Sequence, residues 1–198
     1  MKLAAIAAIG VTILGNKTSL LSDTPNYDDL FKKYSAIDGL DIISGDGARV
    51  LKAIAWKESS MNTHRSAKAG LKNPYDVEGS KSEDGLSYGL MQLRWETADW
   101  LLRKYYGKSL VIDKNDPNFK NTVAYLNNPE NSIMLAAKLL KYHTTLFDKK
   151  NPNFHKAVVT SYNRGAGNIL REVKTNIFSD RTNAYWNPYL NFYNTKAV

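Results

Sequence analysis

The acidic residue Glu58 stands where the surrounding pattern calls for an apolar side chain. Leu51 lies seven residues and Ile54 four residues before it, so on a helix all three side chains share one face. A carboxylate held against apolar surface is costly to ionise, so its pKa rises and it can carry a proton at neutral pH. The pattern therefore indicates a general acid. The alternative from this stretch alone is a glutamate at a frayed helix end, turned to solvent.

Other kinds of active site find little support in the sequence. His64, His143 and His155 are far apart and form no ligand-spaced pair, so we predict no metal site and ordinary surface or capping roles for them. Cysteine is absent, which excludes a disulfide framework and thiolate metal ligands. No strand-to-helix elbow is predicted for a serine nucleophile. The Gly165-Ala166-Gly167 segment follows a predicted helix rather than a strand and lacks the rest of a phosphate-binding pattern.

The composition is that of a folded domain with a positive charge. The chain has 198 residues, 43% of them hydrophobic and 23% charged, which suits one globular domain with a sizeable core. Its net charge of +8 favours a polyanionic partner such as nucleic acid, anionic lipid or an acidic cell-wall polymer. The lysines are spread along the chain, with only Lys32-Lys33 and Lys149-Lys150 adjacent, and no basic stripe is interleaved with aromatics. We therefore predict no nucleic-acid partner.

The hydrophobic periodicity predicts a mainly α-helical domain. Helices are expected over residues 27–34, 47–61, 95–106, 119–126, 129–147, 153–162, 168–175 and 182–193. We expect Asp46 to cap the second helix and Pro129 to open the fifth. Residues 35–45 are expected to form a loop whose apolar side chains reach the core, namely Ile37, Leu40, Ile42 and Ile43. No segment has the alternating period that demands a sheet, and the long polar passage over 62–87 is typical of a functional loop.

The first residues form a separate hydrophobic segment. Met1 and Lys2 precede an apolar run through Gly15, which is shorter than the roughly 20 residues of a membrane-spanning helix. A secretory signal has this shape, but no small-x-small cleavage site follows it. We expect residues 1–22 to be a signal-like export segment, an uncleaved membrane or assembly anchor, or a helix packed on the domain, and residues 23–198 to form the domain itself.

The remaining candidate site residues fall in three segments that are far apart in the sequence. These are Glu58-Ser59, Gly89-Leu90-Met91-Gln92, and Ser161-Tyr162-Asn163 with Gly165. In order and spacing they resemble the motifs of the lytic transglycosylases of the soluble lytic transglycosylase (SLT) type, relatives of goose-type lysozymes. A fourth segment, Thr182-Asn183-Ala184-Tyr185, is similar to the family's closing Thr-x-x-Tyr. The resemblance covers roughly residues 46–193. One tetrapeptide would mean little, but four in order are specific.

Some positions depart from the family pattern. Trp95 stands where the family usually has a proline, and residues 132–136 replace its Asn-Ile-x-x-Gly helix. Ser161 replaces an alanine, and the 62–87 passage is longer than the minimal family version. These are packing and helix-start features, so we expect altered packing rather than lost chemistry, with the shape of the cleft wall left open.

The resemblance implies a lysozyme-like helical fold, peptidoglycan glycan strands as substrate and no cofactor. It implies that Glu58 protonates the β-1,4 bond between N-acetylmuramic acid (MurNAc) and N-acetylglucosamine (GlcNAc), while the substrate's own N-acetyl group stabilises the cation. Glu58 then acts as base on the C6 hydroxyl and a 1,6-anhydro ring closes. No acidic residue stands beside the second and third motifs, in keeping with a single-carboxylate mechanism.

The resemblance also implies roles for Ser59 and for the residues of the second motif, because each matches a position of the family's motifs. Ser59 resembles the hydroxyl that lies near the acid and the bound sugar; the alternative is a helix-end serine satisfied by backbone. Gly89 is expected to permit close backbone approach. Met91 and Gln92 resemble cleft-lining residues, with core packing as the alternative for Met91.

The resemblance implies roles for residues of the third and fourth motifs as well. Tyr162 and Asn163 resemble the polar wall that contacts N-acetyl sugars, and Tyr185 resembles the tyrosine whose hydroxyl reaches the catalytic glutamate. The remaining aromatic candidates are expected in the core rather than as sugar platforms: Trp56, Trp95 and Trp100.

Two rival functions stay open. One is a goose-type hydrolase in which a carboxylate of the long loop positions water, with Asp76, Glu78, Glu83 and Asp84 as candidates. The other is a wall-binding structural module without turnover. For the biology we expect local cell-wall degradation in the envelope, periplasmic or secreted, or by a phage virion, with membrane association through residues 1–22.

Overall fold

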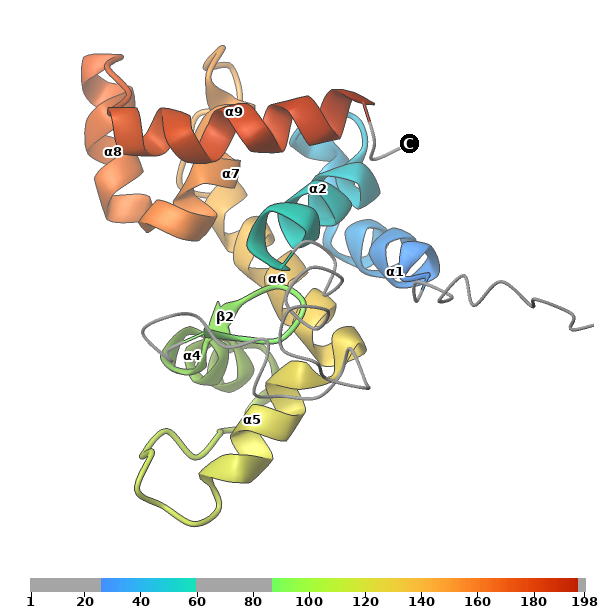
Figure 1. The fold of residues 1–198 in the computed structure, drawn as a ribbon. Helices are drawn as coiled ribbons and strands as arrows, with labels where there is room; N and C mark the ends of the chain where they lie inside the picture. Colours follow the sequence, from blue (N-terminus) through green and yellow to red (C-terminus); the bar gives the residue numbers. More distant parts are fainter. Residues whose placement is uncertain (1–25, 60–86, 196–198) are drawn as a thin grey trace, which may run out of the picture.

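A computed structural model describes residues 26–59 and 87–195, and helices dominate both ranges (Figure 1). In chain order the elements are α1 (Asp28–Asp38), the 3₁₀-helix η1 (Leu40–Ile42), α2 (Gly47–Ser59), β1 (Ser87–Tyr88), β2 (Leu93–Arg94), α4 (Trp95–Tyr106), α5 (Phe119–Asn127), α6 (Pro129–Thr144), α7 (Phe154–Arg164), α8 (Ala166–Thr175) and α9 (Asp180–Thr195). The predicted mainly helical fold is confirmed. The hydrophobic segment at 1–22 lies outside the described residues, as does the long polar passage apart from Ser87.

The helix α6 runs through the middle of the molecule and contacts α1, α2, α4, α5 and α7. It begins as predicted at Pro129, whose missing N–H is harmless in a first turn, and the Asn128 side chain accepts a hydrogen bond from the Asn131 N–H. It ends at Thr144, earlier than predicted. Apolar residues on most of its faces make it a buried helix.

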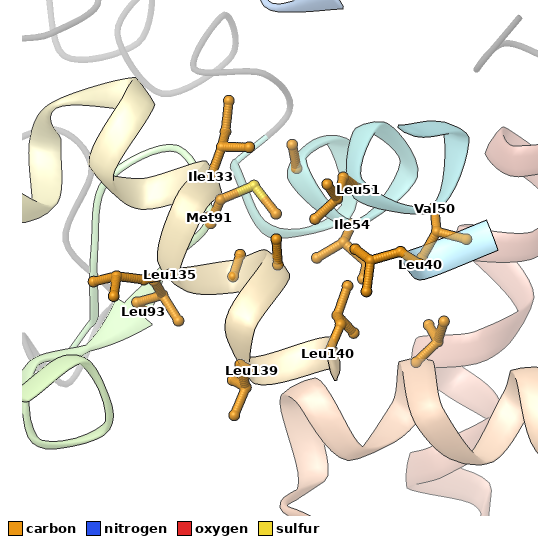
Figure 2. Close-up of a cluster of buried hydrophobic side chains, with 14 of the residues drawn as sticks. Leu40, Val50, Leu51, Ile54, Met91, Leu93, Ile133, Leu135, Leu139 and Leu140 are labelled. Carbon is orange, nitrogen blue, oxygen red and sulfur yellow. The ribbon is translucent and has the colours of Figure 1, made fainter. Parts of the chain in front are cut away.

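The core forms where α6 meets α2 and the β1–β2 hairpin (Figure 2). Ten of its side chains, contributed by these elements and η1, are Leu40, Val50, Leu51, Ile54, Met91, Leu93, Ile133, Leu135, Leu139 and Leu140. Leu51 and Ile54 are fully buried, which confirms that this face of α2 is the apolar one. Asp46 caps α2, as predicted, by accepting a hydrogen bond from the Arg49 N–H.

The prediction of a loop over residues 35–45 is wrong in part. The helix α1 continues to Asp38, so much of the predicted 35–45 loop is helical, and only Leu40 and Ile43 of its apolar residues are buried. Ile37 is 61% exposed and Ile42 41% exposed, because the buried face of α1 is set by Phe31 and its helical neighbours and Ile37 lies off it.

The described residues also include a short sheet, for which the sequence carries no signal. An antiparallel hairpin is present, with Ser87 opposite Arg94 and Tyr88 opposite Leu93. Its strands have two residues each, which is too short for an alternating pattern to show in the sequence.

Across both described ranges, no helix combines the length and apolar character that crossing a membrane demands.

Candidate active site

Glu58 lies in the last turn of α2, partly buried, and receives a hydrogen bond from α9. The Tyr185 hydroxyl donates to Glu58 Oε1 at 2.6 Å, the length of a strong bond to a carboxylate. Burial, and after it the charge of Glu58, raises the pKa of Tyr185 well above its ordinary value. The tyrosine therefore keeps its proton and remains a donor at neutral and mildly alkaline pH.

Ser59 ties the end of α2 to the hairpin turn. Its hydroxyl lies 2.8 Å from the Leu90 carbonyl oxygen and 3.1 Å from the Ala55 carbonyl oxygen, and the residue is buried. This is the geometry of a helix-end serine whose hydroxyl bonds to backbone. Contact between Ser59 and a sugar stays a prediction.

The turn between β1 and β2 requires glycine at its first position. Gly89 has φ of +78°, and a Cβ added there would lie 2.0 Å from the Leu126 carbonyl oxygen. The close approach expected at Gly89 is thus made by the backbone of α5. Gln92 also has a positive φ, of +48°, and both its N–H and its Nε2 donate to the Gly89 carbonyl oxygen, at 3.0 and 2.9 Å. These bonds fix the turn that faces Glu58.

Met91 is a core residue, in keeping with the core-packing alternative, and its side chain is not among the described lining of the pocket. Its side chain is fully buried and lies near Ile133 of α6 (Figure 2). Its backbone serves the site instead, since the Met91 N–H donates to Ser132 Oγ at 3.1 Å and the Met91 carbonyl accepts from the Tyr162 hydroxyl at 2.7 Å. Ser132, one of the departures from the family pattern, therefore anchors the turn.

Tyr162 of α7 bonds to this turn through its hydroxyl and lies close enough to Glu58 to interact with its charge. Burial of its hydroxyl, and then the charge of Glu58, raises the pKa of Tyr162 well above its ordinary value. Two tyrosines on different helices are thus kept protonated near one carboxylate. The next residue, Asn163, is exposed.

These elements enclose a pocket of about 130 Å³. It is lined by Glu58, Ser87, Gln92, Leu93, Arg94, Thr97, Leu139, Tyr162 and Asn163. Four predicted site residues share the pocket, whereas the other four are not among its described lining residues: Ser59, Gly89, Met91 and Tyr185. Among the described residues that line it, Glu58 is the only carboxylate, and in the described ranges no three His, Cys, Asp or Glu residues cluster as metal ligands.

Five lining residues were not predicted: Ser87, Leu93, Arg94, Thr97 and Leu139. Thr97 lies only five residues after Gln92, the last residue of the second motif, so a signal for it existed nearby in the sequence. Leu139 comes from α6 and reaches the pocket through tertiary packing, for which the sequence offers no local sign. Arg94 places an exposed cation at the rim.

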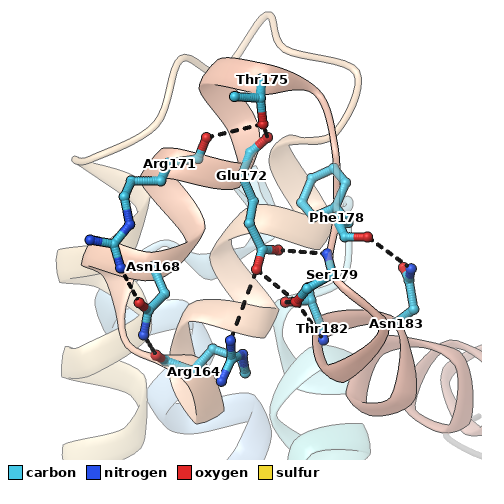
Figure 3. Close-up of polar contacts among 9 residues, drawn as sticks. All are labelled: Arg164, Asn168, Arg171, Glu172, Thr175, Phe178, Ser179, Thr182 and Asn183. Atoms are coloured by element: carbon cyan, nitrogen blue, oxygen red, sulfur yellow. Dashed lines mark hydrogen bonds and ion pairs between the residues drawn. The ribbon is translucent and has the colours of Figure 1, made fainter.

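A polar network holds together the helices that carry Tyr162 and Tyr185 (Figure 3). Glu172 of α8 accepts a hydrogen bond from Ser179 Oγ at 2.8 Å and lies 4.0 Å from the Arg164 guanidinium at the end of α7. Burial opposes the ionisation of Glu172, but hydrogen bonds from Thr182 and Ser179 and the Arg164 charge outweigh it, so the pKa of Glu172 lies below its ordinary value. The carboxylate therefore fixes the start of α9 through Ser179 and Thr182, and Thr182 lies three residues before Tyr185.

The histidines differ from their expected surface and capping roles. His143 is buried, and His155 is partly buried with its Nε2 2.9 Å from the Tyr189 hydroxyl oxygen. Burial lowers the pKa of each to about 4. Neither lines the pocket, and His64 lies outside the described residues.

Comparison with protein families matches residues 43–184 to the family described as transglycosylase SLT domain. The match covers well over half of the chain and spans the segments that carry Glu58, Gln92, Tyr162 and Asn163. Tyr185 lies one residue beyond it. Neither the comparison with curated proteins nor the comparison with solved structures gives a match.

Proposed function

The chain belongs to the transglycosylase SLT domain family, and from that premise we propose that it is a peptidoglycan lytic transglycosylase cleaving the MurNAc-GlcNAc β-1,4 bond. The observation that carries the proposal is the bond of 2.6 Å from Tyr185 to Glu58, at a pocket whose described lining holds no other carboxylate. One carboxylate that must serve twice suits transglycosylation better than a mechanism with a separate base.

In the first step Glu58 donates its proton to the glycosidic oxygen. The bond between that oxygen and MurNAc C1 breaks, GlcNAc leaves as the alcohol, and the substrate's N-acetyl oxygen stabilises the cation at C1. Glu58 becomes a carboxylate at this moment. The Tyr185 hydrogen bond strengthens as the charge forms, so it lowers the energy of the transition state more than that of the ground state.

In the second step Glu58 takes the proton of the MurNAc C6 hydroxyl. The C6 oxygen bonds to C1 and closes the 1,6-anhydro ring, while Glu58 returns to its protonated form. No water enters the product, so the sum of the two steps is an intramolecular transfer. Gln92, Tyr162 and Asn163 line the pocket and are proposed to contact the N-acetyl sugars.

Digestion of purified peptidoglycan followed by mass spectrometry of the muropeptides tests the proposal. We expect anhydro ends, one water lighter than reducing ends, and we expect Glu58→Gln to lower their formation by a factor of about 10² to 10⁴, the typical contribution of a general acid. Glu130→Gln is a matched control, because Glu130 is exposed and does not line the pocket.

The same experiment separates the rivals. Reducing ends alone would contradict transglycosylation and favour the goose-type hydrolase, whose candidate carboxylates Asp76, Glu78, Glu83 and Asp84 lie outside the described residues. Folded wild-type protein that releases no sugar would favour the wall-binding module.

For the biology we propose local degradation of the cell wall in the envelope, periplasmic or secreted, or by a phage virion. Residues 1–22 would then provide export, or membrane or virion association. Fractionation of the native source into membrane, particle and soluble fractions, followed by blotting, tests this proposal. Protein found only in the soluble secreted fraction would contradict an anchoring role.

A further inference from the structure

The seam between α4 and α6 carries aromatic side chains and a lysine at the surface. Trp100 is 38% exposed, contrary to its expected place in the core, and its ring centre lies 4.9 Å from that of Tyr142 in an edge-to-face arrangement. The Lys104 ammonium lies 4.9 Å from the Trp100 ring centre and 4.3 Å from the Tyr142 ring centre. We call these three residues the α4–α6 strip.

The strip continues the lining of the pocket. Thr97 and Leu139 line the pocket, and Trp100 and Tyr142 follow three residues later on the same two helices. Residues three apart on a helix are neighbours on one face, about 4.5 Å along its axis. Trp100 and Tyr142 contact each other across the seam, so the two helices together form one surface that continues the pocket wall.

The pocket is small for a polymeric substrate. Its volume of about 130 Å³ is below the roughly 300–1,000 Å³ of a site that encloses a small-molecule ligand. Most of a glycan strand that reaches Glu58 must therefore lie outside the pocket. A surface that continues the pocket wall is where the strand would run.

We propose that the α4–α6 strip is a further glycan-binding subsite, which holds the strand beyond the bond to be cleaved; this rests on the proposed function. The C–H faces of sugar rings are apolar and pack on aromatic rings such as Trp100, while the hydroxyls remain hydrated. Lys104 supplies a positive charge toward the carboxylates of the wall peptides attached to the strand. Exposed apolar patches with a polar surround mark interaction sites, and continuity with the pocket favours glycan as the occupant.

Binding to uncleaved strands tests the proposal. In the full chain carrying Glu58→Gln, dissociation constants are measured for short muro-oligosaccharides that fill only the pocket and for long peptide-bearing strands. We expect Trp100→Ala to weaken the binding of long strands about three- to tenfold and to leave the short ligand unaffected. Tyr106→Ala is the matched control, because Tyr106 is on the same helix, is 40% exposed and lies outside the strip. Lys104→Gln should weaken the binding of peptide-bearing strands but not of peptide-free strands.

The outcomes separate the two proposals. If Trp100→Ala binds long strands as tightly as its parent, the subsite is overturned and the proposed function stands. If Trp100→Ala weakens both ligands equally, it distorts the pocket, and the subsite is again overturned. If Trp100→Ala adsorbs less to anionic vesicles than its parent but binds glycan strands equally well, the strip binds a membrane surface and the subsite is overturned. A parent that binds neither ligand overturns the proposed function and the subsite together.

Discussion

Tyr185 and Glu58 are 127 residues apart in the sequence, and their side chains make a hydrogen bond of 2.6 Å. Replacing Tyr185 by Phe removes the donor and keeps the ring. A hydrogen bond to a charged group contributes about 1.5–3 kcal/mol, so we expect kcat to fall about 10- to 100-fold with little change in KM. Steady-state release of anhydro-muropeptides measures both constants.

Tyr193→Phe is the control for this variant. Tyr193 is on the same helix and also makes one hydrogen bond through its hydroxyl, to Ser44 Oγ at 3.0 Å, away from the pocket. Its kcat should equal that of the wild type. Wild-type turnover in Tyr185→Phe would mean that the bond holds α9 in place without serving catalysis.

Single residues were predictable where a motif fixes both their type and their backbone position. Glu58, Gln92, Tyr162 and Asn163 meet at one pocket, as the order of motifs implied. For Met91 the sequence left cleft lining and core packing both open, because the direction of a side chain in this short hairpin depends on how the turn packs against α6.

The helix α8 contributes no residue to the described lining of the pocket, but its Glu172 holds the start of α9, which carries Tyr185. Glu172→Ala removes the acceptor for Ser179 and Thr182 and leaves the largely buried Arg164 without its carboxylate. We expect the free energy of unfolding to fall by about 2–4 kcal/mol, measured by urea denaturation. We also expect kcat to fall, because the start of α9 loses the contacts that hold Tyr185 toward Glu58.

Glu130→Ala provides the contrast. Its ion pair with Lys33 is exposed on both sides, so its loss should lower the free energy of unfolding much less than the loss of Glu172 does. Equal effects of the two substitutions would contradict a structural role for the Glu172 network.

Element boundaries followed the sequence where local signals end a helix. The helix α4 covers the predicted residues 95–106, since Gly107 adopts the left-handed conformation that terminates it. The helix α1 outran its prediction because Tyr34, Ser35 and Asp38 continue the buried face set by Phe31, which only tertiary contact with α2 and α6 reveals.

The molecule as a whole gathers its pocket from α2, the hairpin, α4, α6 and α7, so packing around α6 is a condition for any chemistry at Glu58. Packing of this kind depends on pH where it buries titratable groups. His143 is 4% exposed, and burial, opposed by a weaker hydrogen bond with the Val158 backbone, lowers its pKa from 6.5 to about 4. The fold therefore holds His143 neutral where an unfolded chain would protonate it.

This shift predicts a loss of stability in mild acid. Between pH 6.5 and about 4 the unfolded chain binds a proton at His143 that the folded chain does not, so the free energy of unfolding falls as the pH falls, by up to about 3 kcal/mol. Urea denaturation at pH 7, 5.5 and 4 measures the slope. His143→Gln should reduce the slope without abolishing it, because His155, whose pKa is also lowered to about 4, contributes in the same pH range. The lowered pKa of Glu172 also stabilises the fold, but over a different pH range. Its contribution to the free energy of unfolding is lost only as the pH falls below about 4.5. A variant that keeps the full slope between pH 6.5 and 4.5 would show that His143 is not its source.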